Sequence, residues 1–230
     1  MGYIKEHGIE AVCFDIDGTL YPKWQTNLRL VESALLHIPF SLSYLSMRNK
    51  LRRKNGLDGG TFSGRDGFLK EEYTALYGKY DEEGVEKFRR KEERVFFIPW
   101  QKSFSSITPF PHMRESLLKI KKEARIAFLS DFPIGVKLEA LDVGDIPEFA
   151  ISTEDIGALK PSHVPFEYLS SLLGLENDKI LYVGDSEQKD VRGAKNVGMH
   201  TLLIKTHGKA SSKADIVVSS YPEMCRVLLE

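Results

Sequence analysis

The chain has 230 residues, of which 42% are hydrophobic and 28% are charged, a composition that fits a globular protein with a buried core and argues against a fibrous or disordered chain. Its 32 basic and 33 acidic residues give a net charge of -1, which argues against the broad positive field of a nucleic-acid-binding protein. No run approaches the roughly 18 apolar residues of a membrane span, and charges interrupt the region where a signal peptide would be apolar.

The two cysteines, Cys13 and Cys225, are too few for a disulfide framework and lack the spacing of metal ligands. Cys13 lies in an apolar run, so core packing is its predicted role. Together with the missing signal peptide, this cysteine usage predicts a protein of the reducing cytoplasm.

The first predicted strand is the apolar run Ala11–Phe14, which ends in an acidic turn containing glycine. The stretch Tyr21–Thr108 that follows has helical patterns throughout, with Asp66 and Asp81 as predicted N-caps. We therefore predict a helical cap domain over residues 21–108, inserted into a core domain made of residues 1–20 and 109–230. The predicted cap helices are Leu28–Ile38, Leu42–Arg53, Gly67–Tyr80 and Glu82–Phe97.

Four features of the predicted cap are open to more than one interpretation. The densest basic stretch, Arg48–Lys54, is interpreted as a solvated helix face, with attraction of an anionic substrate as the alternative. The glycine-rich stretch Gly56–Gly64 lacks phosphate-loop spacing, so a flexible connection is preferred over substrate contact. Trp24 and Trp100 flank the cap, and core packing is predicted for both, with hinge contacts as the alternative.

From Pro109 onward, short apolar runs alternate with helical patterns. This alternation predicts an α/β fold, in which helices cover both faces of a doubly wound parallel sheet. The predicted strands are Arg125–Leu129, Lys179–Val183, His200–Ile204 and Ala214–Val218. The predicted helices are Met113–Lys122, Phe166–Leu173 and Asp190–Val197.

Polar side chains follow three of the predicted strands: Asp15 and Asp17, then Ser130, then Asp185. Ligands of such sheets bind at the carboxyl ends of the strands, so we expect these groups to meet there with Lys160 from a loop. Carboxylates brought together repel one another and require a cation. Oxygen ligands without a histidine or cysteine cluster favour Mg²⁺, and the set as a whole predicts phosphoryl transfer through an aspartate.

The run Asp15–Leu20 resembles the first signature of the haloacid dehalogenase-like hydrolase superfamily. Three further signatures match in order: a strand ending in Ser130, Lys160 followed by proline, and Gly184–Ser186 followed by Asp190. A lone pair of aspartates is a weak signal, whereas four signatures in the right order are a strong one. The resemblance covers Ala11–Leu20 and about residues 109–204, and it implies a Rossmann-like core with an inserted cap.

The resemblance implies a role for each acidic residue of these signatures. Asp15 attacks phosphorus to form an aspartyl-phosphate, and its other oxygen binds the metal. Asp17 protonates the leaving alkoxide, activates the hydrolytic water and contacts the metal through its backbone carbonyl. Asp185 is the second carboxylate ligand, and Asp190 supports it from behind.

The resemblance also assigns the groups that bind the substrate phosphate. Ser130 donates a hydrogen bond to a phosphoryl oxygen, and Lys160 neutralises Asp15 and the transferring group. One departure from the family pattern is Asp131, which stands where many relatives carry asparagine. An extra acid beside a phosphate is unfavourable unless it points away or the substrate carries a cation.

The predicted function is therefore that of a Mg²⁺-dependent phosphohydrolase acting on a small phosphorylated metabolite, with neither a nucleic acid nor a membrane as partner. Asp17 argues against dehalogenation, which needs no proton donor at that position. The alternatives are a phosphomutase of the sugar-phosphate mutase type and, less favoured, an inactive binding protein. The sequence predicts neither the substrate nor the oligomeric state.

Overall fold

The structure, a computed structural model, describes residues 1–58, 64–205 and 213–230, without the side chains of Arg29 and residues 54–58. Most of the glycine-rich stretch and the Lys54 side chain thus lie outside the described residues. Six parallel strands form one sheet in the order β3-β2-β1-β4-β5-β6. The strands are β1 (Ala11–Phe14), β2 (Arg125–Ser130), β3 (Phe149–Ser152), β4 (Ile180–Gly184), β5 (His200–Ile204) and β6 (Ile216–Val218).

Strand β1 lies in the middle of the sheet, where Ala11 pairs with Arg125 of β2 on one side and with Ile180 of β4 on the other. Its four residues are fully buried because helices cover both faces of the sheet, as expected for a parallel sheet. Cys13 packs in the core, as predicted.

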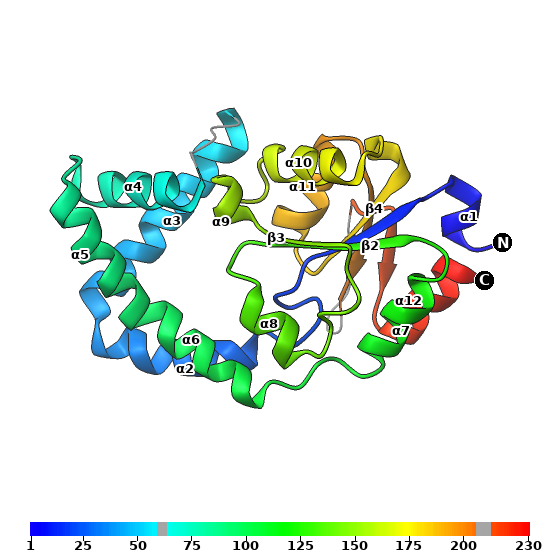
Figure 1. Cartoon of the computed structure of the whole chain (residues 1–230), viewed down its shortest axis with the longest axis horizontal. Helices are drawn as coiled ribbons and strands as arrows, with labels where there is room; N and C mark the ends of the chain where they lie inside the picture. Colours follow the sequence, from blue (N-terminus) through cyan, green and yellow to red (C-terminus); the bar gives the residue numbers. More distant parts are fainter. Residues whose placement is uncertain (59–63, 206–212) are drawn as a thin grey trace.

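Alternate strand residues face two different layers of helices. Val12 and Phe14 pack in one cluster with α1 (Tyr3–His7), α7 (Met113–Ile120) and α12 (Tyr221–Leu229). Ala11 and Cys13 pack in the other with α10 (Val164–Leu173) and α11 (Arg192–Asn196). Figure 1 shows α10 and α11 on one side of the sheet and α7 and α12 on the other. The predicted doubly wound architecture is confirmed.

Strand β3, at the edge of the sheet, was not predicted from the sequence. Ala150 is exposed, and Phe149 and Ile151 are only partly buried, so this strand lacks the continuous apolar run of a central strand. The predicted helix Asp190–Val197 is also corrected, since a π-helical turn, η4 (Glu187–Val191), leads into a short α11.

The chain between β1 and α7 is helical, as predicted (Figure 1). Asp81 caps α5 by accepting a hydrogen bond from the Gly84 N–H, as predicted, whereas Asp66 lies inside the first turn of α4 and is no N-cap. Trp100 is buried, but Trp24 is 63% exposed, so core packing was wrong for Trp24. These helices are α2 (Trp24–Leu36), α3 (Ile38–Asp58), α4 (Gly64–Tyr77), α5 (Glu82–Glu92), η1 (Glu93–Phe97), α6 (Ile98–Ser103) and η2 (Phe104–Ser106).

The inserted helices have an aromatic core of their own, built around Phe40, Tyr44, Phe68 and Phe88. The division into a cap over residues 21–108 and a separate core domain stays a prediction. No helix in the described ranges is long and apolar enough to cross a membrane.

A buried cluster of charges joins the inserted helices to α9 (Thr153–Ile156) beside β3. Arg48 donates to Glu72 at 2.7 Å and to Glu154 at 2.8 Å, and Arg65 pairs with Glu92 at 2.8 Å and with Glu154 at 2.9 Å. The prediction of a solvated helix face is therefore wrong for Arg48, which is buried. The three carboxyl groups outnumber the two guanidinium groups, and burial raises the pKa of Glu72 to about 8.

We predict that Glu72→Gln stabilises the protein by an amount that grows as the pH rises above about 4.5. Between about pH 4.5 and pH 8 the folded chain keeps a Glu72 proton that the unfolded chain loses, so wild-type stability falls as pH rises through this window. The variant lacks this loss and should be more stable than wild type by roughly 2 kcal/mol or more at pH 9, but equal to it near pH 4.

Thermal unfolding measured from pH 4 to pH 9 checks this expectation. Glu82→Gln, at an exposed position of α5, is the matched control and should track the wild type at every pH. Parallel curves for wild type and Glu72→Gln over the whole range would contradict the expectation.

Candidate active site

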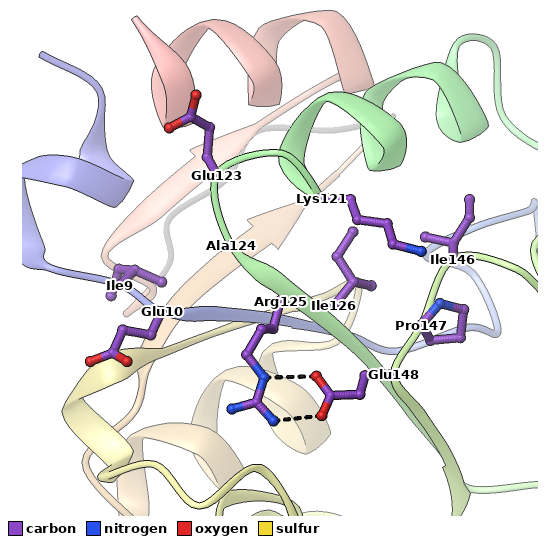
Figure 2. Close-up of a pocket in the computed structure, with 10 residues that line it drawn as sticks. All are labelled: Ile9, Glu10, Lys121, Glu123, Ala124, Arg125, Ile126, Ile146, Pro147 and Glu148. Carbon is purple, nitrogen blue, oxygen red and sulfur yellow. Dashed lines mark hydrogen bonds and ion pairs between the residues drawn. The ribbon is translucent and has the colours of Figure 1, made fainter.

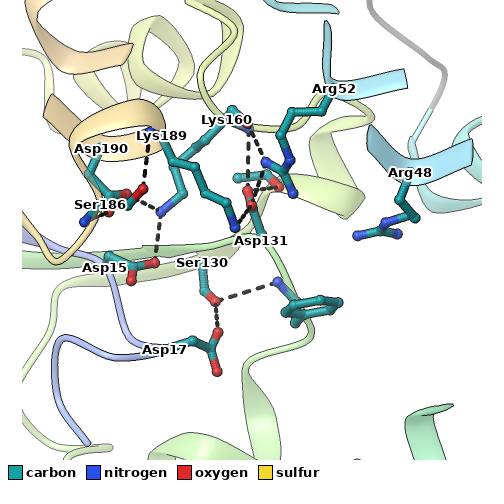
Figure 3. Close-up of polar contacts among 12 residues, drawn as sticks. Asp15, Asp17, Arg48, Arg52, Ser130, Asp131, Lys160, Ser186, Lys189 and Asp190 are labelled. Atoms are coloured by element: carbon teal, nitrogen blue, oxygen red, sulfur yellow. Dashed lines mark hydrogen bonds and ion pairs between the residues drawn. The ribbon is translucent and has the colours of Figure 1, made fainter. Parts of the chain in front are cut away.

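The polar groups predicted to meet at the carboxyl ends of the strands do lie together. Asp15 follows β1, Ser130 ends β2, and Asp185 follows β4. Asp15 and Asp185 surround one small hollow together with Lys160 and Asp190, whereas Ser130 does not line it and contacts Asp17 instead. Figure 3 shows Asp15, Asp17, Ser130, Lys160 and Asp190 in this region. We call this hollow of about 50 Å³ the reaction cavity; its lining residues are Asp15, Asp17, Lys23, Asp131, Phe132, Lys160, Asp185, Lys189 and Asp190.

Lys160 bridges two of the acids. Its Nζ lies 2.7 Å from Asp15 Oδ1 and 2.7 Å from Asp190 Oδ1, and the side chain is only 1% exposed. Burial alone would lower the pKa of Lys160, but Asp15 and Asp190 raise it well above its usual value. Lys160 is therefore a permanent cation. Asp190 is also held from its other side, where it accepts a hydrogen bond from the Ser186 N–H at 3.0 Å.

Three carboxyl groups lie close enough to share a cation. One oxygen each of Asp15, Asp185 and Asp190 falls within 4.8 Å of the other two. An all-oxygen set of this kind suits a hard divalent cation such as Mg²⁺. Asp190, which is predicted to support the ligands from behind, has an oxygen within this same limit, and its role stays a prediction. Burial raises the pKa of Asp15, an effect that Lys160 opposes and Asp190 reinforces.

The Asp17 carboxylate faces a different set of partners. It accepts hydrogen bonds from Ser130 Oγ at 2.8 Å, from the Tyr21 hydroxyl and from Lys137 Nζ. Lys137 also donates to Ser130 Oγ at 2.7 Å and is fully buried, with its Nζ 5.1 Å from the centre of the Trp100 ring. Burial raises the pKa of Asp17, but the charge and hydrogen bond of Lys137 outweigh this and lower it.

The loop Asp15–Leu20 needs glycine at Gly18. Its φ is +92°, in the left-handed region, and a Cβ atom there would lie 2.4 Å from Asp185 Oδ2. Thr19, in the same turn, donates to Asp15 Oδ2 at 3.2 Å. The turn therefore brings Asp15 and Asp185 close together.

Asp131, the departure from the family pattern, is neutralised by cations. Its Oδ2 accepts from Arg52 at 2.7 Å and lies 3.5 Å from Lys189 Nζ, while its Oδ1 accepts from Thr153 Oγ1 at 3.1 Å. Burial raises the pKa of Asp131, but Arg52 and Lys189 bring it well below its usual value. A solvated face was therefore wrong for Arg52 as well, because from α3 it pairs with Asp131, which lines the reaction cavity.

Several cations and donors of this site, Lys189 among them, were not predicted from the sequence. Lys23 Nζ holds both oxygens of Asp185 at 2.7 Å, and Tyr21, Arg52 and Lys137 contact the other acids. No sequence signature marks Lys137, a single lysine in the short helix α8 (Gly135–Ala140). Arg52 could have been found only by choosing the alternative interpretation of the basic stretch.

Two larger cavities adjoin the reaction cavity and meet at Tyr44, Leu45, Phe132 and Lys189. The first, of about 270 Å³, is named the apolar cavity, and its further lining residues are Asp17, Lys23, Thr26, Asn27, Leu30, Phe96, Phe97 and Trp100. The second, of about 630 Å³, is named the basic cavity, and its further lining residues are Arg48, Asn49, Arg52, Arg53, Pro161, Ser186, Gln188 and Arg192.

A hollow of about 660 Å³ at the opposite, amino ends of the strands is drawn in Figure 2. Arg125 there donates to Glu148 through two hydrogen bonds of 2.7 Å, so its charge is already paired. None of the predicted reactive residues lines this hollow. The reaction cavity, which Asp15, Asp17, Lys160 and Asp185 do line, is therefore the candidate active site.

Known proteins resemble this chain over most of its length. A family model described as haloacid dehalogenase-like hydrolase matches residues 9–198. The curated glyceraldehyde 3-phosphate phosphatase of Methanocaldococcus jannaschii is 26% identical over 93% of this chain and 92% of its own. Its name supports the predicted enzyme class, a phosphatase.

Solved structures agree on the fold. The 2-haloacid dehalogenase from Pseudomonas syringae pv. Tomato DC3000 superposes with a TM-score of 0.65 at 20% identity, covering 96% of this chain and 98% of its own. A HAD phosphatase from Thermococcus onnurineus superposes with a TM-score of 0.61 at 22% identity, over the same shares of both chains.

We predict that Lys137→Met destabilises the protein by about 3 kcal/mol, because the buried Asp17 carboxylate loses its counter-charge. The double variant Asp17→Asn/Lys137→Met should recover most of that loss, since no unpaired charge then remains. Urea unfolding of the single and double variants measures this coupling. Lys119→Met, on the exposed side of α7, is the control, and strictly additive effects at positions 17 and 137 would contradict the expected ion pair.

Proposed function

Because this chain belongs to the haloacid dehalogenase-like hydrolase family, we propose that it is a Mg²⁺-dependent phosphatase of a small phosphorylated metabolite. The family predicted from the four signatures is thereby confirmed. In this proposal the reaction proceeds through an aspartyl-phosphate on Asp15, and the cap of residues 21–108 covers the core domain. The observation that carries the proposal is the grouping of Asp15, Asp185 and Asp190 around Lys160 at the carboxyl edge of the sheet.

Asp15 acts as the nucleophile in the proposed reaction. One carboxylate oxygen attacks phosphorus, and the bond between phosphorus and the ester oxygen breaks as the aspartyl-phosphate forms. Lys160 is held 2.7 Å from Asp15 and supplies positive charge for the transferring group. Asp15 lines the reaction cavity, which supports this role.

Asp17 moves the protons. As a carboxylic acid it donates its proton to the leaving alkoxide oxygen. As a carboxylate it then takes a proton from the water that attacks the aspartyl-phosphate, which releases inorganic phosphate and restores Asp15. The ion pair with Lys137 favours the ionised form of Asp17, which is the form that the second step requires. Ser130 lies 2.8 Å from Asp17, where its hydroxyl could turn to a phosphoryl oxygen.

The residues present fit a magnesium ion, since the donor atoms are all oxygens. Asp15, Asp185 and the backbone carbonyl of Asp17 would hold it, with Asp190 close by. Bound magnesium would neutralise charge on the transferring phosphoryl group. Lys23, which now pairs with Asp185, would then be free to turn toward the anionic substrate.

Two other functions are weighed against this proposal. A sugar-phosphate mutase would use the same aspartyl-phosphate but return the phosphoryl group to a bound intermediate; incubation with a hexose phosphate separates the two by isomer against free phosphate. The phosphatase name of the relative from Methanocaldococcus jannaschii supports hydrolysis. An inactive binding protein is disfavoured because the Asp15, Asp17, Lys160 and Asp185 set is intact.

We predict that Asp15→Asn lowers phosphate release by at least about 1000-fold, because an amide cannot form the covalent intermediate. Circular dichroism should show an unchanged fold. Asp178→Asn, an exposed carboxylate on η3 (Asn177–Lys179), is the control and should keep wild-type activity. Retention of more than a trace of activity in Asp15→Asn would remove this residue as nucleophile.

We also predict that excess chelator reduces phosphate release to a few per cent and that added Mg²⁺ restores it, since the clustered carboxylates need a divalent cation to bind a phosphate dianion. Release of inorganic phosphate is the measurement. Unfolding temperature recorded in the same buffers separates loss of catalysis from loss of fold. Full activity in excess chelator would count against the metal assignment.

A further inference from the structure

We propose that the substrate is a phosphate monoester whose alcohol part is an apolar ring or chain, and that the apolar cavity binds that part. This inference rests on the proposed function and names its substrate class. Three observations carry it: which cavity Asp17 lines, what the walls of that cavity consist of, and how large it is.

The position of Asp17 selects the cavity. As the proton donor, Asp17 must lie within hydrogen-bonding distance of the leaving oxygen, so the group attached to that oxygen extends into a space that Asp17 lines. Asp17 lines both the reaction cavity and the apolar cavity. It does not line the basic cavity. The alcohol part of the substrate therefore points into the apolar cavity.

The walls of this cavity are aromatic and aliphatic. Leu30 comes from α2, Phe96 and Phe97 from η1, and Trp100 from α6. The charged lining groups, Asp17, Lys23 and Lys189, also line the reaction cavity, so charge is confined to the end where phosphate would bind. This polarity matches a molecule with a phosphate at one end and an apolar body.

The polar atoms in these walls already have partners. The Thr26 hydroxyl donates to the Lys23 carbonyl at 3.0 Å, and the Tyr44 hydroxyl donates to Glu92 at 2.5 Å. Among the described lining residues, Asn27 at the exposed side is the uncharged amide that remains. A polyol bound here would lose its hydrogen bonds to water without replacing them, which is costly. Burial of an apolar ring against these side chains is favourable instead.

The volume also suits a ring. An apolar cavity of about 150 Å³ is known to accept benzene, and this one measures about 270 Å³. It therefore has room for one ring and a short linker to the phosphate oxygen.

The basic cavity has a different use in this arrangement. Arg53 and Arg192 line it and have no acidic partner within the described part of the chain. Such charges draw an anionic phosphate toward the site from solution. A substrate with a second anionic group would use this cavity as a binding site, and that is one outcome of the experiment below.

The test compares phosphate release from benzyl phosphate, n-butyl phosphate, glycerol 1-phosphate and fructose 1,6-bisphosphate, all esters of alkyl alcohols. We expect kcat/KM for benzyl phosphate to exceed that for glycerol 1-phosphate at least about tenfold, as apolar pockets discriminate by this order. Higher kcat/KM for glycerol 1-phosphate or for the bisphosphate than for benzyl phosphate would overturn the inference.

Variants in α2 locate the effect. Leu30→Asn should lower kcat/KM for benzyl phosphate about tenfold and change that for glycerol 1-phosphate less than about twofold. Leu28→Asn, at a 61% exposed position of the same helix outside all three cavities, is the matched control and should change neither. Leu30→Met, which keeps an apolar side chain, should retain the preference for benzyl phosphate. Equal losses for both substrates in Leu30→Asn would contradict the inference.

Failure of the inference and failure of the proposed function are distinguishable. If wild type releases phosphate from glycerol 1-phosphate or the bisphosphate in preference to the apolar esters, the phosphatase proposal stands and the substrate class is wrong. If wild type with Mg²⁺ releases phosphate from none of the four esters, both are wrong.

Discussion

The structure depends on one electrostatic constraint, namely that several carboxylates at the carboxyl edge of a buried sheet must each face a cation. Lys160, almost completely buried, meets this requirement for Asp15 and Asp190 at once. An unpaired carboxylate in that position would be very costly. Each remaining acid of the site has its own partner: Asp17 with Lys137, Asp185 with Lys23, and Asp131 with Arg52.

These pairs tie the site to the inserted helices. Lys23 stands at the start of α2, and Arg52 lies on α3, so both cations come from the segment between β1 and α7. The buried cluster of Arg48 and Glu154 fastens the same helix α3 to α9 a short distance away. The proposed cap of residues 21–108 and the proposed catalytic groups are thus linked through ion pairs as well as through apolar contacts. Any movement that opens the site must first separate such pairs.

Local patterns account for what was predictable from the sequence. Short apolar runs that end in acids mark the central strands, because a strand buried on both faces permits few other residues. Recognition of these strands was enough to predict that Asp15 and Asp185 lie at the same edge of the sheet. Strand β3 was not predicted, because most of its residues are exposed or only partly buried. The buried positions of Lys137 and Arg48 were not predicted for another reason. From sequence alone a lysine or arginine is expected to be solvent-exposed, because its acidic partner is known only from the tertiary structure. The partner is Asp17 for Lys137 and Glu72 for Arg48. The roles of the site residues stay predictions.

The loop Asp15–Leu20 has a further dependence, on a residue far along the chain. The buried Tyr221 hydroxyl donates to the Thr19 carbonyl at 2.7 Å, and in the described sheet β1 pairs with the strands that begin at Arg125 and Ile180. During synthesis on a ribosome, Asp15 and its neighbours therefore emerge before the two strands that flank β1. A strand whose contacts are so distant in sequence forms its sheet slowly, since loop closure must come first. Asp15 and Asp17 thus lack these sheet contacts until β4 has been translated.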